Sequence, residues 1–386
     1  MSSHPTIETG IPQLPGNLLP PASWVSCSLF RGHQAAVHHV AFSPDGSRLA
    51  TASADTTVRI WNLARRREWI ALEGHTNAVF CAVFAPGGSR LATASDDGTA
   101  RIWDVKSGEC LFVLHGHAGP VNCAAFSPEG SLLATASDDG TALLWNARSG
   151  QCTAVLSGHR DSVRHLAFSR NGTRVATASR DGTARLWEVK QGQGLFLLEG
   201  HQRPVNHVEF SRTGTVLATA SGDGSARIWD VRTGGCKFAI KGHAEPIHHL
   251  AFAPGWQALS LACADGTIGL WQEWAEEPQP DLTGHSGQVV HTAWSSNGVL
   301  LGSASLDGTA RLWDVRQRRL LTVLEGHEGP ILHLAFAPGS LNLATASEDH
   351  TARLWRAPRP GETRAPDYWE GFADWCESYF EWFKRL

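Results

Sequence analysis

Residues 116–146, with the sequence GHAGPVNCAAFSPEGSLLATASDDGTALLWN, contain the pattern that decides the fold of this chain. Two apolar, β-prone runs, 121–126 and 132–137, are separated by a turn at 127–130 (Ser-Pro-Glu-Gly). The pair Asp139-Gly140 is a strong hairpin signal and leads into a third run, 141–145. A turn at 148–150 (Arg-Ser-Gly) precedes a fourth run, 152–156. Because no segment with a helical period lies between these runs, the stretch predicts four short strands.

The same unit occurs eight times, and each copy begins 42 residues after the last without an insertion or deletion. Every copy opens with Gly-His and carries an Asp 22 residues and a Trp 28 residues after that His. The repeated histidines are His33, His75, His117, His159, His201, His243, His285 and His327. The repeated aspartates are Asp55, Asp97, Asp139, Asp181, Asp223, Asp265, Asp307 and Asp349. Regular units of this kind indicate a repeat fold rather than the two or three domains that 386 residues would suggest.

The unit GHxxxVxxxAFSPxG…LATASxDGTARLWD resembles the WD-repeat, or WD40, family over about residues 25 to 356. In this family each repeat supplies four strands of one propeller blade. The resemblance therefore implies an all-β, eight-bladed WD40 β-propeller. The near-identical repeats without insertions are more similar to those of bacterial members of the family than to the diverged eukaryotic ones.

The two ends of the repeat region decide how the ring closes. Residues 356–360 cannot form a fourth strand after Trp355, because their prolines lack an N–H donor. Residues 25–30 resemble the fourth run of the other units, so we expect this N-terminal strand to complete the last blade and leave no open sheet edge. The alternative is a seven-bladed ring with one extra unit.

The predicted organisation of the chain has four parts. We expect a flexible N-terminal segment at 1–23, the propeller at 24–356, a Pro-rich linker at 357–366 and an aromatic amphipathic helix at 367–386. The polar residues of the last segment recur at helical spacing, and acidic residues come before Lys384 and Arg385, as the helix dipole favours.

Composition restricts the class of function. The net charge of −4 and the pI near 6.5 argue against nucleic acid as a partner. No stretch of 18 or more apolar residues is present, and residues 1–21 lack the basic and apolar regions of a secretory signal. The eight cysteines form no CxxC pair, which favours reduced thiols and a cytoplasmic location.

The repeated His, Ser and Asp residues are easily mistaken for eight catalytic triads. The resemblance to WD repeats instead implies that His, Ser, Asp and Trp form a hydrogen-bonded network inside each blade, for example His117, Ser137, Asp139 and Trp145. A buried carboxylate and imidazole need such partners. Cys263 replaces the Ser in the sixth unit, so we expect a weaker network there. No catalytic residue is predicted, and we expect the chain not to be an enzyme.

A second set of histidines occupies one position of the innermost strand, six residues after the Gly-His histidine. This set comprises His39, His165, His207, His249, His291 and His333, with Cys81 and Cys123 in the same position of the second and third units. Such side chains could ring the central channel. His and Cys are good ligands for zinc or copper, but an eight-bladed channel should hold them too far apart for one ion. We therefore predict no metal and no cofactor, and keep a metal- or ligand-binding channel and a pH-sensitive contact as alternatives.

Positions where the repeats differ are candidates for partner binding. WD-repeat proteins usually engage partners on the face that bears the Gly-His and Asp turns. The uneven residues predicted on that face are Phe80, Asp96, Asp138, Arg164, Arg180, Val290, Leu306 and Leu332. Arg and large apolar residues are common interface anchors, and an exposed apolar cluster suggests a contact surface. The alternative is that these are surface residues that have drifted.

The C-terminal segment offers a second candidate attachment point. Its apolar face carries Trp369, Phe372, Trp375, Tyr379, Trp382 and Phe383. This aromatic surface could dock on the propeller, enter a groove of another protein, which we favour, or lie on a membrane. Its acidic polar face makes a membrane the least favoured partner.

Taken together, the sequence predicts a non-enzymatic scaffold for protein–protein interaction, a subunit of a multiprotein complex. Its partners would be other proteins, bound through the Gly-His face and the C-terminal helix. A regulatory sensor for a separately encoded enzyme is one alternative, and a ligand-binding propeller that uses the channel is the other.

Overall fold

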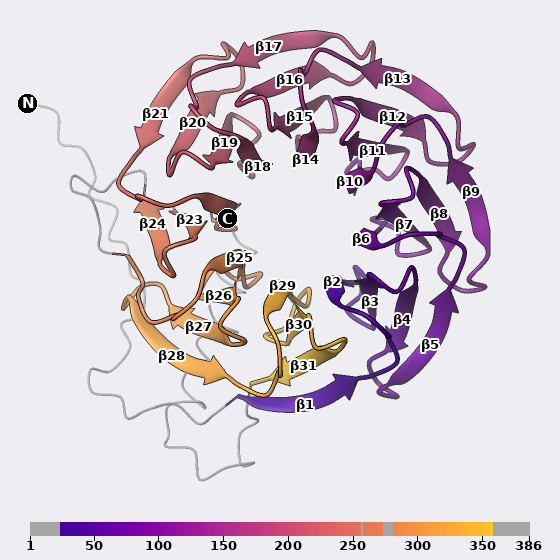
Figure 1. Ribbon diagram of the computed structural model, residues 1–386, viewed down its shortest axis with the longest axis vertical. Coiled ribbons are helices and arrows are strands. Elements are labelled where there is room, and N and C mark those ends of the chain that lie inside the picture. The colour runs from indigo at the N-terminus through magenta and orange to yellow at the C-terminus, as the bar shows by residue number, and fades with distance from the viewer. Residues whose placement is uncertain (1–23, 256–257, 273–280, 358–386) are drawn as a thin grey trace, which may run out of the picture.

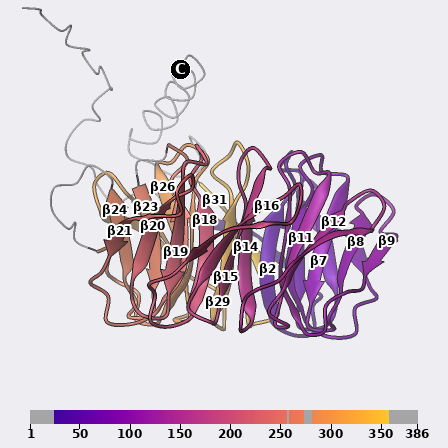
Figure 2. The ribbon, with the colours of Figure 1, turned by 90° about the horizontal axis from the view of Figure 1, so that it is seen from above.

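The computed structural model describes residues 24–255, 258–272 and 281–357 of the chain. Within these residues every regular element is a strand, and the strands form eight antiparallel sheets around a central channel (Figure 1). Seen from the side, the ring is a thick disc in which the strands run between its two faces (Figure 2). The predicted eight-bladed β-propeller is thereby confirmed.

Each blade is built from successive strands that run outward from the channel, as Figure 1 shows. The innermost strands of blades 1 to 8 are β2 (Val37–Phe42), β6 (Val79–Phe84), β10 (Val121–Phe126), β14 (Val163–Phe168), β18 (Val205–Phe210), β22 (Ile247–Phe252), β25 (Val289–Trp294) and β29 (Ile331–Phe336). The second strands are β3 (Arg48–Ser53), β7 (Arg90–Ser95), β11 (Leu132–Ser137), β15 (Arg174–Ser179), β19 (Val216–Ser221), β23 (Ala258–Cys263), β26 (Leu300–Ser305) and β30 (Leu343–Ser347).

The outer half of each blade follows the same order. The third strands are β4 (Val58–Asn62), β8 (Ala100–Asp104), β12 (Ala142–Asn146), β16 (Ala184–Glu188), β20 (Ala226–Asp230), β24 (Ile268–Gln272), β27 (Ala310–Asp314) and β31 (Ala352–Arg356). The outer strands of blades 1 to 5 and 7 are β5 (Arg67–Leu72), β9 (Cys110–Leu114), β13 (Cys152–Leu156), β17 (Gly194–Leu198), β21 (Cys236–Ile240) and β28 (Arg319–Leu324). Among the described residues blade 6 has three strands, and a single bridge between Ile268 and Leu282 replaces its fourth.

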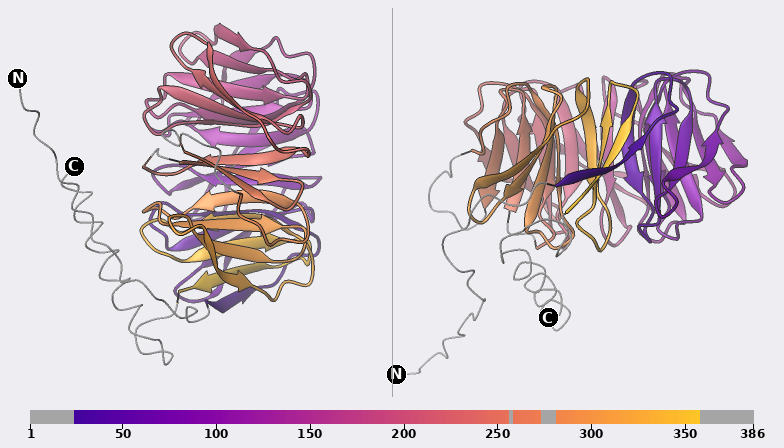
Figure 3. Two further views of the ribbon diagram at one scale, coloured as in Figure 1. Left: turned by 90° about the vertical axis from the view of Figure 1, so that its left-hand side faces the viewer. Right: turned by 90° about the horizontal axis from the view of Figure 1, so that it is seen from below.

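The N-terminal strand completes the last blade. Strand β1 (Val25–Phe30) pairs antiparallel with β31, in a register that runs from Val25 opposite Arg356 to Phe30 opposite Ala352. Figure 3 shows this indigo strand lying beside the yellow strands of the C-terminal repeat. Residues more than 300 positions apart in sequence thus share one sheet, and the outer edge of β31 is paired with β1.

The hydrophobic core lies between neighbouring blades. The second strands are buried almost throughout: their two Ala residues face one neighbouring blade, and the Leu or Val, Thr and Ser residues that alternate with them face the other. The Trp of one blade packs against the strands of the preceding blade, as Trp145 does against Ala92 and Ile102. Small Ala residues on the second strand allow this close approach of flat sheets. The core is therefore a ring of eight inter-blade contacts.

Candidate functional site

A chain of hydrogen bonds links the repeated His, Asp and Trp side chains of each regular blade. In blade 3, Trp145 Nε1 donates to Thr135 Oγ1 at 2.9 Å, and Thr135 Oγ1 lies 2.8 Å from His117 Nε2. The other ring nitrogen, His117 Nδ1, lies 2.9 Å from Asp139 Oδ2. Blades 1, 2, 4, 5, 7 and 8 repeat these contacts, with Ser303 in place of Thr in blade 7.

The role predicted for the Ser of each unit is corrected by this geometry. Ser137 does not connect the His to the Trp: its hydroxyl donates to Gly119 O and accepts the N–H of Asp139. The connecting residue is Thr135, two positions earlier on the same strand face. The sequence contained the signal, because Thr stands at that position in six of the eight units. The reason is geometric: Ser137 lies at the end of β11 next to the turn, whereas Thr135 lies one step further into the strand, closer to Trp145 on the neighbouring strand, and reaches both rings.

The protonation of the network follows from its contacts. Burial alone would raise the pKa of the Asp97 carboxyl, but hydrogen bonds from Thr99 and His75 outweigh it and hold the pKa at about 2. Desolvation lowers the pKa of the His75 imidazole, although Asp97 partly opposes it. With an ionised Asp and a neutral His, every hydrogen bond of the chain has the same donor direction. The Trp N–H donates to Thr, the Thr O–H donates to His, and the His N–H donates to Asp. Every atom that could act as a base is engaged, so the network stabilises the blade.

Blade 6 departs from this pattern. Leu261 stands where the other blades have Thr or Ser, and Cys263 stands where they have Ser. His243 Nδ1 lies 3.7 Å from Asp265 Oδ2 and 3.8 Å from Asp281 Oδ2, both beyond hydrogen-bond distance. Trp271 is half-buried, whereas the equivalent Trp of every other blade is buried. The hydrogen-bond chain is therefore absent from the described part of this blade.

The second set of histidines forms a continuous arc around the channel. Neighbouring rings from His165 through His207, His249, His291 and His333 to His39 lie 3.8 to 4.1 Å apart, centroid to centroid. Cys81 and Cys123 occupy the same position in the two remaining blades, and both are buried free thiols. Four of the rings have a buried Nδ1 without a hydrogen-bond partner among the described residues. His165 Nδ1 lies 3.2 Å from Val208 O, and His249 Nδ1 lies 3.5 Å from the backbone nitrogen of Thr292, so stacking on a neighbouring imidazole is what all six rings have in common.

This arc does not converge on one point. Within the part of the chain that the structure describes, the only group of three or more potential ligand atoms within 4.8 Å of one another is His243, Cys263 and Asp265. The ring therefore offers no three-ligand metal centre in this geometry. Its clearest property is electrostatic, because burial lowers the pKa of His39 and of His165 to about 4.

The channel histidines should make the fold sensitive to mild acid. An unfolded His titrates near 6.5, so between pH 6.5 and 4 the unfolded chain binds protons that folded His39 and His165 refuse. The free energy of unfolding should therefore fall as pH decreases through this window, by at most about 1.4 kcal/mol per pH unit for each ring. Urea unfolding at a series of pH values measures this slope.

A double variant isolates the contribution of the ring. His207→Gln with His249→Gln removes two titrating groups and should flatten the slope between pH 6.5 and 4. His115→Gln, at an exposed position, is the matched control and should leave the slope unchanged. Equal slopes for all three proteins would contradict the assignment of acid sensitivity to the channel.

Glu209, on an innermost strand, is a half-buried acidic residue that the sequence did not lead us to single out. It lies on β18, and its Oε2 accepts the N–H of Phe252 from blade 6 at 2.9 Å. Burial raises the pKa of its carboxyl to about 8, so Glu209 is protonated at neutral pH. The repeat pattern could have identified this residue, because the equivalent position in every other blade is Ala or Val and only blade 5 has a charged residue there.

The predicted partner-binding residues lie at the ends of the strands that carry the Gly-His and Asp turns, which we call the top face. Arg164, Arg180, Asp138 and Leu306 are exposed, and Leu306 is 37% exposed. Phe80, Asp96, Val290 and Leu332 are half-buried.

Neighbouring residues modify what this face presents. Phe80 contacts the ring of His38, with centroids 5.8 Å apart. Val290 packs against the core between blades 7 and 8, so the predicted apolar cluster of Val290, Leu306 and Leu332 is more enclosed than expected. Asp138 accepts hydrogen bonds from Asn122 and Ser162.

The aromatic residues predicted at 367–386, together with the segments 1–23 and 358–366, lie outside the described residues.

Charge is unevenly distributed over the top face. Every blade carries the repeated Asp in its Asp turn. Beyond it, the top turns of blades 4 and 5 carry one acidic residue, Asp161, and four exposed Arg residues: Arg160, Arg164, Arg180 and Arg203. In the corresponding turns of blades 8, 2 and 3, the Asp, Glu, Lys and Arg residues other than the repeated Asp are all acidic: Glu328, Glu348, Asp96 and Asp138. We call the first group the basic sector and the second the acidic sector.

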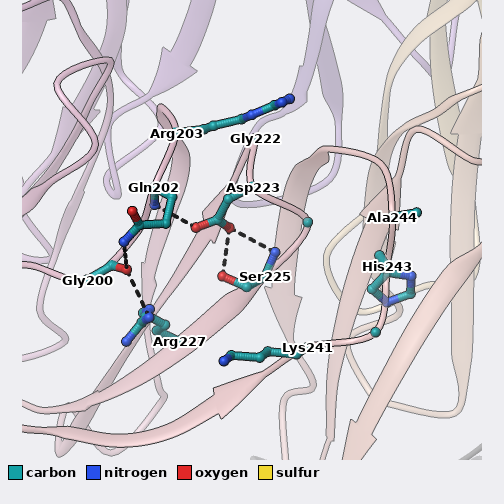
Figure 4. Close-up of a pocket in the computed structure, with 12 residues that line it drawn as sticks. Gly200, Gln202, Arg203, Gly222, Asp223, Ser225, Arg227, Lys241, His243 and Ala244 are labelled. Carbon is teal, nitrogen blue, oxygen red and sulfur yellow. Dashed lines mark hydrogen bonds between the residues drawn. The ribbon is translucent and has the colours of Figure 1, made fainter.

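An open pocket of about 550 Å³ adjoins the basic sector between blades 5 and 6. Arg203, Arg227 and Lys241 line it, and Figure 4 shows them around Asp223, with His243 at the far side. Gly222 leaves this part of the face open, since every other blade has a larger residue there, from Ala in blades 1 and 6 to Arg in blade 4. Arg227 donates to Gly200 O at 2.9 Å, which holds its guanidinium along the pocket wall.

Comparisons with known proteins agree with this architecture. Residues 126–365 match the family model described as "IFT122 first beta-propeller", and residues 24–62 and 67–104 match the model described as "WD domain, G-beta repeat". The crystal structure of the computationally designed Ika8 protein superposes with a TM-score of 0.76 at 27% identity, over 84% of this chain and 97% of that one.

One curated relative is a ribosome biogenesis protein, ERB1 of Chaetomium thermophilum. It is 42% identical over 59 residues, which are 15% of this chain and 7% of that protein. Proteins of the matched families are typically non-enzymatic modules that bind other proteins. In the described residues no helix has the length and apolarity needed to cross a membrane. The repeats, the closed ring and the match over more than half of the chain show that this protein belongs to the WD-repeat β-propeller family.

Proposed function

We propose that this protein is a scaffold subunit that binds a partner protein through the top face, with the basic sector as the principal contact. The observation that carries the proposal is the contrast between the interior and this face. The hydrogen-bond chain and the core repeat almost unchanged in seven blades, whereas the exposed residues of the top turns differ from blade to blade. Residues that differ on an otherwise repeated frame can create one specific surface from eight similar units.

The charges indicate what kind of partner fits. Arg164 and Arg180 lie close enough to interact: partial desolvation and then Arg180 lower the pKa of the Arg164 guanidinium, while Asp138 and Asp161 partly offset this repulsion. An acidic segment of a partner would relieve this repulsion. Arg also forms bidentate bonds to carboxylates, which gives such a contact geometric specificity. The acidic sector, which begins at Asp138 in the adjacent blade 3 and continues through blades 2 and 8 (Figure 1), would orient the partner by repelling the same segment.

Two further parts of the proposal rest on sequence. The aromatic segment 367–386 is proposed as a second attachment point, in a groove of another protein. A cytoplasmic location is proposed because all seven cysteines of the described residues are free, as expected in a reducing compartment. No enzymatic activity is proposed for this chain.

A charge-reversal pair tests the top face. Arg164→Glu with Arg180→Glu should abolish binding of the partner captured by in-cell crosslinking and mass spectrometry. The wild-type interaction should also weaken as ionic strength rises, since exposed charges dominate it. The matched control is Arg148→Glu with Arg170→Glu, which makes the same change in net charge at exposed turns on the opposite face. Partner sets that are identical for both double variants would contradict the proposal.

A truncation tests the second attachment point. A chain ending at Pro366 should lose a different subset of crosslinked proteins and keep those that depend on Arg164. If the captured set includes an enzyme whose rate changes when this chain is added, the regulatory-sensor alternative gains direct support. Retention of every partner by the truncated chain would remove the tail from the proposal.

A further inference from the structure

Blade 6 differs from the other blades by a coordinated set of substitutions around one imidazole. Leu261 removes the hydroxyl that would bond His243, and Cys263 brings a thiol to the position of the usual Ser. Gly269 replaces the Arg found at this position in six blades. Asp281 occupies a position that carries Ala, Val or Leu in the outer strands of blades 1 to 5 and 7. The four changes lie on three segments that meet at His243.

The absence of a side chain at Gly269 determines where the imidazole lies. A Cβ at this position would stand 2.7 Å from His243 Nε2, closer than any real contact allows. In the regular blades the Arg at this position instead covers the Gly of the Gly-His pair, as Arg185 does when it donates to Gly158 O. Gly269 therefore makes room for the ring of His243 in a position that the other blades exclude.

The potential ligand atoms gather around this ring. His243, Cys263 and Asp265 each offer one atom, and these three atoms lie within 4.8 Å of one another. Asp281 Oδ2 lies 3.8 Å from His243 Nδ1, on the side of the bridge between Ile268 and Leu282. The His243 side chain is 8% exposed, and none of its ring nitrogens has a hydrogen bond among the described residues. A nine-tenths-buried imidazole is thus surrounded by a thiol and two carboxylates that it does not directly bond.

The spacing of these atoms matches a small tetrahedral cation. With Zn–N and Zn–O bonds near 2.0–2.1 Å and a Zn–S bond near 2.3 Å, the edges of a tetrahedral zinc site are roughly 3.3–3.6 Å long. The observed separations of 3.7 and 3.8 Å between His243 Nδ1 and the two carboxylates are close to such edges and too long for hydrogen bonds. The imidazole, thiol and carboxylate groups are all ligand types that zinc uses, whereas calcium and magnesium prefer oxygen ligands alone.

We propose that blade 6 contains a structural zinc site in which His243, Cys263 and Asp265 are ligands, and that Asp281, which lies near His243 but outside this group of three, moves in as the fourth ligand when the cation binds. The cation takes the place of the hydrogen-bond chain that blade 6 lacks. It also joins Asp281 to the second strand, and so holds the segment at Leu282 against Ile268 where the fourth strand is replaced by a single bridge. This site is separate from the channel histidines and does not depend on the partner-binding function proposed above.

Cobalt substitution provides the most direct test. The full chain, stripped of metal with a chelator, is titrated with Co²⁺ and followed by absorption. We expect one equivalent to bind with the d–d bands of tetrahedral Co²⁺ and a thiolate-to-cobalt charge-transfer band, and Zn²⁺ to displace it. Adding Zn²⁺ should also raise the thermal midpoint of the apo-protein, because binding to the folded state alone is stabilising.

Variants assign the ligands without relying on stability. Cys263→Ser introduces the residue of the other seven blades, so it should fold, and it should lose the charge-transfer band. Asp281→Asn should weaken Zn²⁺ binding by more than the roughly 10–100-fold expected for an outer-shell partner. Cys152→Ser, at an exposed thiol, and Cys123→Ser, in the channel, are the matched controls and should keep the band.

A repaired blade gives an independent readout. Leu261→Thr, Cys263→Ser and Gly269→Arg together install the regular hydrogen-bond chain and should make the thermal midpoint independent of Zn²⁺. The proposal is overturned if no charge-transfer band forms, if the band survives Cys263→Ser, or if it disappears with Cys123→Ser. None of these outcomes affects the test of Arg164 and Arg180.

Discussion

A chain that begins at Arg31 should fail to form a stable monomeric propeller. Such a chain lacks β1, and the edge of β31 that β1 covers would be exposed along its whole length. Phe30 is 2% exposed in the closed ring, and its ring centroid lies 5.0 Å from that of Trp61 in blade 1. The same buried cluster includes Leu354, Ala352 and Val37. Loss of the strand therefore opens the contact between the first and last blades.

The size of this effect can be bounded from one residue. Phe30→Ala alone should cost about 3–5 kcal/mol of unfolding free energy, as is usual for a buried Phe. Removing the whole strand also removes its backbone pairing and leaves an unpaired edge that promotes association. Size-exclusion chromatography should show oligomers or aggregates, and the urea midpoint of any soluble fraction should fall.

A longer truncation and a peptide complete this test. A chain beginning at Ser23 keeps β1 and should remain monomeric with an unchanged midpoint. A synthetic peptide of residues 22–31 added to the chain that begins at Arg31 should restore the monomer by pairing with β31. A monomeric chain without β1, with the wild-type midpoint, would show that the ring does not depend on this closure.

Thr135→Val should destabilise the protein by about 2–4 kcal/mol. Valine keeps the shape of threonine and removes only the hydroxyl that connects Trp145 Nε1 to His117 Nε2, at 2.9 and 2.8 Å. Both ring atoms would then be buried without a partner, and each such group costs about 1–3 kcal/mol. Equilibrium urea unfolding followed by Trp fluorescence measures the change.

The chain itself supplies the control for this substitution. Blade 7 uses Ser303 at the equivalent position, with contacts of 2.8 Å to His285 and 2.9 Å from Trp313. Thr135→Ser should therefore stay within about 1 kcal/mol of the wild type, because only a partly packed methyl group is lost. Equal destabilisation by Val and Ser would mean that packing, and not the hydroxyl, accounts for the effect.

The seven blades with the hydrogen-bond chain and blade 6, which lacks it, differ in what holds their top turns in place. Seven blades use the same chain of Trp, Thr or Ser, His and Asp, which holds the top turns in fixed positions. Turns fixed in this way can carry different exposed residues without a change in backbone, which a binding surface requires. Blade 6 gives up the hydrogen-bond chain, and the zinc proposal states what stabilises it instead.

The sequence alone determined the fold and the closure of the ring. A 42-residue period with Gly-His, Asp and Trp at constant spacing predicts one blade per unit, because each unit contains four β-prone runs and turn residues between them. The prolines after Trp355 and the strand-like run at 25–30 were enough to predict that β1 completes blade 8. These features are local in sequence or repeat eight times, so no three-dimensional information was needed to recognise them.

Tertiary structure alone decided which repeated atoms meet. The sequence pointed to Ser137, but Thr135, two residues earlier on the same face of β11, is the link between His117 and Trp145. The tertiary structure also determined that the channel imidazoles stack at about 4 Å without surrounding a common point, whereas ligand atoms of His243, Cys263 and Asp265 lie close to one another. Distances between side chains on different strands depend on sheet twist and on packing against neighbouring blades. A linear period carries no information about them, so the best candidate for a metal site lies in the one blade where the repeat fails.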